Sequence, residues 1–172
     1  RRTMRHINVS YAAACEPVAR ICSLLLGEKL KTLPPDVAEP LYLGIASDTG
    51  WFRYSNTTAQ TFRLAAALID AGANADRVYQ IAEQSDSPER ILLMQRALTS
   101  LRLLDDNRVA VMTLRRKDFE QTGTTDDEAG GLIDLPRSVG SVRVTVLATE
   151  VETNFTKVSF RSKPGTDEVD VN

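Results

Sequence analysis

Histidine and cysteine are scarce in this sequence, which has one histidine, His6, and two cysteines, Cys15 and Cys22, among 172 residues. These residues do not make the ligand set of a zinc site, and they form no Cys-His catalytic pair. The two cysteines are about two turns apart on a predicted helix, which is too far for a disulfide bond. We therefore expect buried, reduced thiols in a cytoplasmic protein, and a structural or exposed role for His6.

Long apolar runs and a strong excess of one charge are also missing. No stretch of eighteen apolar residues and no signal-peptide pattern occurs, so the sequence predicts no membrane span. A formal net charge of −2 and a pI of about 5.5 exclude a generally basic, nucleic-acid-coating surface, although they allow a local cationic pocket. No glycine-rich phosphate loop and no G-x-S-x-G motif is present. The first residue is an arginine, so we expect a piece of a longer protein.

The apolar periodicity and the capping residues predict an α/β fold in two units, joined by the polar segment "EQSDSP". The first unit, residues 1–80, is rich in helix. We expect its helices at residues 10–26, 33–48, 58–72 and 75–85, with a short strand, "WFRY", at residues 51–54. The helix over 33–48 is apolar on nearly all sides after Pro40 and should be buried, and Asn56 or Thr57 is the expected cap of the third helix.

The second unit, residues 87–172, contains most of the predicted strands. We expect a helix at 87–104, a strand at 107–114, a helix at 124–139, and strands at 141–151 and 155–163. A hairpin turn at 152–154 would join the last two strands. We interpret "LRRKDF", residues 114–119, as a surface turn, and "GTDEVDVN", residues 165–172, as the approach to a helix.

Two places carry residues of the kind that bind ions. Asp48 ends the buried helix in "GIASDTG", where Asp-Thr-Gly is either a helix end and turn or a rigid oxygen ligand for Mg²⁺ or Mn²⁺. Arg161 and Lys163 stand at alternate positions of a strand beside Ser162, and they either bind phosphate oxygens or protect a solvated strand edge. These residue patterns alone do not identify an activity.

Longer stretches of the chain resemble a known family. "LYLGIASDTGWFRYSNTTAQTFRLAAALIDAGA" resembles the final motif of the DHH phosphoesterases, in the oligoribonuclease and pAp phosphatase group. "TTDDEAGGLIDLPRSVGSVRVTVL" and "VSFRSKPGTDEVDVN" resemble the DHH-associated (DHHA1) domain of the same group. The resemblance implies a helical C-terminal part of a DHH domain over residues 1–80 and an α/β DHHA1 substrate-binding domain, truncated at its end, over residues 87–172.

The family's chemistry would be hydrolysis of phosphoesters in short oligonucleotides, pAp or cyclic dinucleotides by two Mn²⁺ or Mg²⁺ ions. The resemblance assigns Asp48 as a metal ligand and Arg161 as a substrate-binding residue, with Ser162 and Lys163 as weaker neighbours. The D-H-H triplet, the family's other metal ligands and the G-G-G-H loop do not occur in the chain. We therefore expect a fragment without catalytic residues of its own and without measurable activity. The alternative is a non-catalytic module that binds nucleotides or a protein, and a homodimer is compatible with either interpretation.

Overall fold

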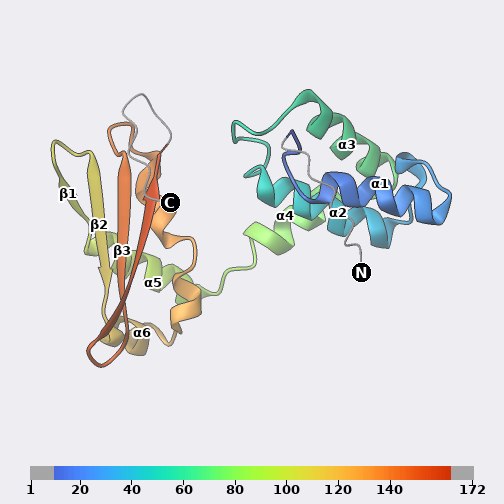
Figure 1. Cartoon of the computed structure of the whole chain (residues 1–172). Coiled ribbons are helices and arrows are strands. Elements are labelled where there is room, and N and C mark those ends of the chain that lie inside the picture. Colours follow the sequence, from blue (N-terminus) through green and yellow to red (C-terminus); the bar gives the residue numbers. More distant parts are fainter. Residues whose placement is uncertain (1–9, 164–172) are drawn as a thin grey trace, which may run out of the picture. The chain divides into compact units, whose positions relative to one another are not determined.

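The computed structural model describes residues 10–163, so His6 and the predicted approach to a helix at residues 165–172 lie outside the described residues. The chain divides into two compact units, residues Arg1–Ser85 (unit 1) and Asp86–Asn172 (unit 2). Figure 1 labels helices α1 to α6 and strands β1 to β3. The mixture of helices with a four-stranded sheet confirms the predicted α/β class.

Unit 1 is helical. Its elements are α1 (Cys15–Leu26), η1 (Leu30–Thr32), α2 (Pro35–Asp48), α3 (Ala59–Asp70) and α4 (Ala75–Glu83). Helix α2 is the centre of the core, because Ala38, Ile45 and Ala46 are fully buried and Leu41 and Tyr42 nearly so. Pro35 stands at the first helical position, where its missing N–H is not needed. The burial predicted for this helix is therefore confirmed.

Unit 2 packs helices against one sheet. Its helices are α5 (Pro88–Thr99), α6 (Arg116–Thr122), η2 (Asp126–Ala129) and η3 (Leu132–Ser138). Its strands are β1 (Arg102–Leu104), β2 (Val109–Leu114), β3 (Val144–Glu152) and β4 (Phe155–Ser162), in the order β1-β2-β3-β4. The central pair β2–β3 is parallel and both outer pairs are antiparallel. The predicted hairpin is confirmed, since β3 and β4 pair around a turn in which Asn154 has φ 65°.

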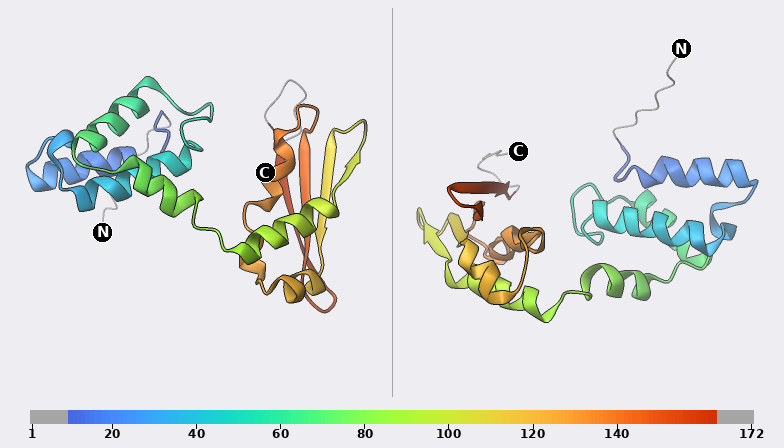
Figure 2. Two further views of the ribbon diagram at one scale, coloured as in Figure 1. Left: turned by 180° about the vertical axis from the view of Figure 1, so that it is seen from behind. Right: turned by 90° about the horizontal axis from the view of Figure 1, so that it is seen from below.

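The core of unit 2 lies between the sheet and its helices. Alternate residues of β2, namely Ala110, Met112 and Leu114, are fully buried, while the residues between them are partly or largely exposed. Met112 and Leu114 pack with Leu93 of α5 and Phe119 of α6 in one hydrophobic cluster. Figure 2 shows α5 lying across this face of the sheet.

Four predictions of local structure were wrong. Residues 51–54 form turns instead of a strand, because Trp51 and Phe52 have φ values of 57° and 63°, outside the extended region. The segment "LRRKDF" leads into helix α6 instead of a surface turn. The predicted helix at 124–139 is two 3₁₀ helices separated at Gly130 and Gly131. The cap of α3 is Thr58, whose side chain accepts the N–H of Thr61 at 3.2 Å.

Two helix boundaries also differ from the prediction. Helix α1 begins at Cys15 and leaves Val18, Ile21 and Leu25 exposed, while it buries Glu16 and Ala19. Helix α5 ends at Thr99, so three leucines of the predicted helix lie outside it: Leu101 comes between α5 and β1, and Leu103 and Leu104 belong to β1. Among residues 10–163, no helix is long and apolar enough to cross a membrane.

Candidate functional site

Asp48 is the last residue of α2, and the residues that follow it end the helix in a Schellman motif. The N–H of Trp51 donates to the carbonyl of Ala46 at 2.7 Å, and the N–H of Gly50 donates to that of Ser47 at 3.1 Å. Gly50 has φ 55°, in the left-handed region that this motif requires. The Asp-Thr-Gly sequence therefore does form a helix end, as the plainer of the two sequence interpretations predicted.

The carboxylate of Asp48 lies at a position where a negative charge lowers the stability of the helix. An acid in the last turn of a helix faces the negative end of the helix dipole, which favours cations there instead. Thr49 beside it is buried, and its hydroxyl donates to the Ile45 carbonyl at 2.7 Å, whereas Asp48 is exposed. The buried helix thus holds an exposed carboxylate rigidly at a point where a bound cation would relieve its electrostatic cost.

Asn56 contacts the backbone of Asp48, and the Cys15 thiol is affected by the charge of the Asp48 carboxylate. The amide of Asn56 donates to the carbonyl of Asp48 at 3.1 Å and to that of Ala12 at 3.0 Å, so it ties the segment before α1 to the end of α2. Burial raises the pKa of the Cys15 thiol, and the charge of Asp48 raises it further. Cys15 and Cys22 are free thiols, and both are half-buried, so they are less buried than predicted.

The described residues do not complete a metal site around Asp48. Within residues 10–163, no group of three His, Cys, Asp or Glu side chains could hold a metal ion. Each Mn²⁺ or Mg²⁺ takes about six ligands, most of them oxygens. The described part of the chain therefore holds no complete metal centre around Asp48, and a resident metal does not fit it without further donors.

The aromatic residues that follow Asp48 pack onto neighbouring helices. The rings of Trp51 and Tyr79 meet edge to face at 4.8 Å, and the indole N–H of Trp51 donates to Glu83 at 2.8 Å. Phe52 stacks on Phe62 of α3 at 5.3 Å. The turn after Asp48 is therefore fixed to α3 and α4, which adds to the rigidity of the helix end.

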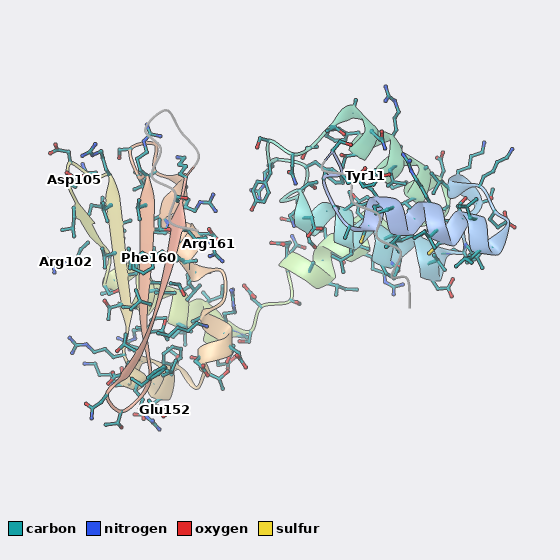
Figure 3. All side chains as sticks on the ribbon, in the orientation of Figure 1. Tyr11, Arg102, Asp105, Glu152, Phe160 and Arg161 are labelled. Carbon is teal, nitrogen blue, oxygen red and sulfur yellow. The ribbon has the colours of Figure 1, made fainter. Side chains whose placement is uncertain are left out.

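In unit 2, Arg161, Ser162 and Lys163 lie together at the end of β4 (Figure 3 labels Arg161). Arg161 is exposed, and its guanidinium donates to the carbonyl of the neighbouring Phe160 at 3.2 Å. The ammonium of Lys163 donates to the carbonyls of Arg137 and Val139 at 3.2 and 3.3 Å. Lys163 thus holds the end of η3 against β4, while the Arg161 guanidinium faces solvent.

The structure therefore groups the three predicted residues of β4 in unit 2, and it places Asp48 in unit 1. Sequence reasoning missed Asn56, because the "NTT" segment was interpreted only as a helix cap. The sequence signal for its role is weak, since it depends on a contact with Ala12, forty-four positions earlier.

Comparisons with known proteins agree with the motif assignment. No family model matches the chain. It is 31% identical to the probable bifunctional oligoribonuclease and PAP phosphatase NrnA of Streptococcus mutans over 144 residues, which are 83% of this chain and 45% of that protein. It is 28% identical to NrnA of Bacillus subtilis, over 80% of this chain and 42% of that protein. NrnA of Thermus thermophilus is 29% identical over 92% of this chain and 46% of that protein.

A solved structure has the same fold. An exopolyphosphatase-related protein from Bacteroides fragilis superimposes with a TM-score of 0.81 at 22% identity, over 90% of this chain and 45% of that one. The chain spans about half the length of the curated relatives that it matches. The resemblance predicted from its motifs is confirmed: this chain is a DHH-family homologue of the NrnA-type oligoribonuclease and PAP phosphatases.

Proposed function

We propose that this chain is part of a metal-dependent hydrolase that cleaves phosphoesters in short oligonucleotides, pAp or cyclic dinucleotides. The names of its relatives support the substrate class. In this proposal residues 1–80 are the end of a DHH domain and residues 87–172 are a DHHA1 domain. The observation that carries it is the exposed carboxylate of Asp48 in the GIASDTG segment, at a helix end that the Asn56 amide fixes through the Asp48 carbonyl.

In the proposed site, Asp48 is one ligand of a centre that holds Mn²⁺ or Mg²⁺. Such ions, when bound, activate a water molecule and stabilise charge on the phosphate oxygens. The part of the chain that the structure describes contains no group of three His, Cys, Asp or Glu side chains that could hold a metal ion, around Asp48 or elsewhere. We therefore expect residues 1–172 alone to be inactive, and the full product of the open reading frame to carry the activity.

Arg161 is the proposed anchor for the substrate. Its planar guanidinium can donate two parallel hydrogen bonds to phosphate oxygens, and its only bond within residues 10–163 is to a neighbouring carbonyl. Ser162 is a candidate for a further hydrogen bond. The ammonium of Lys163 is already bonded to two carbonyls, so we assign Lys163 the role of positioning the end of β4.

The test compares Asp48→Ala with Asp70→Ala in the full product of the open reading frame. Asp70 is a matched control, since it is also an exposed acid at the last position of a helix, α3. Loss of a metal ligand should lower Mn²⁺-dependent release of mononucleotides from a dinucleotide by about 10³-fold or more, and Mn²⁺ binding should weaken as well. Asp70→Ala should leave both quantities unchanged.

Removal of either acid should also stabilise its helix by about 0.3–1 kcal/mol, because a charge that opposes the dipole is gone. Loss of activity together with unchanged or higher stability would separate a metal-binding role from a folding defect. Turnover that survives Asp48→Ala would contradict the proposal. Nucleotide binding through Arg161 without turnover at any Mn²⁺ concentration would favour the non-catalytic module instead.

A cytoplasmic location and a homodimer are further parts of the proposal. A cytoplasmic protein fits the free cysteines. A homodimer stays a prediction, which light scattering on the full product would test.

A further inference from the structure

A basic cleft of about 430 Å³ opens in unit 2, away from Arg161, Ser162 and Lys163. Four cationic side chains line it, from the last turn of α5, the start of β1, and the N-cap and first turn of α6: Arg96, Arg102, Arg115 and Lys117. Asp118 is the one acidic residue among its described lining residues. The cations come from three separate elements, so the cleft cannot be recognised from one stretch of sequence.

The topology explains why these side chains meet. Strands β1 and β2 are antiparallel, with Arg102 opposite Val111, so the start of β1 lies beside the middle of β2 and the residues just before β1 lie toward the end of β2. The hydroxyl of Ser100 accepts the N–H of Thr113 at 2.8 Å and donates to the carbonyl of Ala97 at 2.7 Å. These bonds fix the end of α5 to β2 and hold the wall of the cleft in place.

The charges in the cleft are not balanced by the protein. Within residues 10–163, the side chains of Arg96, Arg102, Arg115 and Lys117 form no ion pair. Asp118 is engaged by a backbone group, since it accepts the N–H of Arg115 at 2.7 Å. Arg116, which stands between two of the cations, pairs with Glu120 at 3.1 Å. Grouped like charges repel one another, and a bound anion would remove that repulsion.

The lining also limits the kind of anion. No aromatic residue is among the described residues that line the cleft, so it offers no ring on which a nucleobase could stack. One arginine guanidinium can donate two parallel hydrogen bonds to the oxygens of a phosphate. If each of the four cations neutralises one phosphate charge, the cleft suits a ligand with at least two phosphates. Arg102 belongs to β1 and Arg161 to β4, at opposite edges of the sheet, as the labels in Figure 3 show.

We propose that the basic cleft binds a linear chain of phosphate groups, at a site separate from Arg161. Two sources share this chemistry, namely the backbone of a single-stranded oligonucleotide and a condensed inorganic phosphate. Binding needs no divalent ion, so it can be measured in EDTA. Failure of the cleft to bind phosphates and failure of the metal-dependent activity are therefore distinguishable.

The experiment measures binding of tripolyphosphate and of a five-nucleotide single-stranded RNA to the 172-residue chain in EDTA. The cleft variant is Arg102→Gln with Lys117→Gln. The control is Arg108→Gln with Arg116→Gln, which removes the same charge from unit 2 at arginines that are already ion-paired. The cleft variant should bind about tenfold or more weakly, and the control within about twofold of the original chain.

The salt dependence gives a second readout. The slope of log K against log salt for the RNA should fall by about 0.7 for each phosphate that the variant no longer neutralises, in the cleft variant only. If the double variant loses its far-UV circular dichroism, Lys117→Gln against Arg116→Gln gives the same comparison with one charge. Binding of either ligand with this pattern supports the proposal and identifies the source of the phosphates. Equal weakening in the variant and the control, or no binding to the original chain, would overturn it.

Discussion

Gly50 shows how closely single residues fix the end of α2. Its φ of 55° is strained for other residues, and a Cβ placed there would overlap the ring of Tyr54. Two requirements therefore meet at one position, a left-handed backbone and an absent side chain. The residue that lets the chain turn away from Asp48 is thus as constrained as Asp48 itself.

We expect Gly50→Ala to lower the free energy of unfolding of unit 1 by more than about 1–2 kcal/mol, which is the cost of a left-handed backbone alone. Gly27→Ala is the matched control for that backbone cost, because Gly27 has φ 67° with nothing near its Cβ position. Urea unfolding followed by the fluorescence of Trp51 measures both. Equal losses of stability in the two variants would mean that the contact with Tyr54 adds nothing.

Cys15 reports on the charge of Asp48. Burial and then the Asp48 carboxylate raise the pKa of its thiol, which lowers the fraction of reactive thiolate at neutral pH. In a Cys22→Ala background, Asp48→Asn should lower that pKa and move the pH profile of alkylation to lower pH. Asp70→Asn serves as control. A profile that Asp48→Asn leaves in place would show that the carboxylate does not act on the thiol.

At the scale of elements, the contribution of one helix cap to the stability of its unit can be tested. Ser87 accepts the N–H of Arg90 at 3.1 Å and caps α5. Ser87→Ala should destabilise unit 2 by about 1 kcal/mol, and Ser87→Asn, which keeps an acceptor, should restore most of that stability. Chemical denaturation followed by circular dichroism gives both values. Equal instability of the two variants would show that the capping hydrogen bond does not stabilise α5.

Most elements could be predicted because their signals are local. Helix α2 has its proline and its apolar faces, and strands β2, β3 and β4 have their alternation. The aromatic residues after Asp48 have high β propensity, but Gly50 and the positive φ of Trp51 and Phe52 turn the chain back.

The site residues could be predicted only where they belong to one continuous segment of the sequence. The position of Asp48 at the end of a buried helix follows from the sequence, and so does the pair of cations on β4. The contact of Asn56 with Ala12 and the basic cleft each depend on residues far apart in the chain. No local pattern encodes such contacts, because the fold creates them.

At the scale of the whole molecule, the described buried apolar residues other than Ala110 and Val142 fall into two clusters that share no residue. Leu68 in the first cluster and Leu93 in the second are both fully buried. Leu68→Ala and Leu93→Ala should each cost about 2–5 kcal/mol, and only in the unit that contains the leucine. Trp51, the single tryptophan, reports on unit 1, and hydrogen exchange of β2 and β3 reports on unit 2. A change in both readouts from either variant would contradict separate folding units.

The parallel pairing of β2 with β3 also governs how unit 2 reaches its native state. In the outer pairs, β1–β2 and β3–β4, the two strands are neighbours in sequence and are connected by short turns, so these hairpins can form early in folding. The inner pair, β2–β3, forms only when the helices between these strands have packed on one face of the sheet. Its connecting segment is longer than those of the outer pairs, so its formation costs more conformational entropy. We therefore expect the pairing of β2 with β3 to be the late, rate-limiting step in the refolding of unit 2, and pulsed hydrogen exchange should show the amides bonded between these two strands protected last.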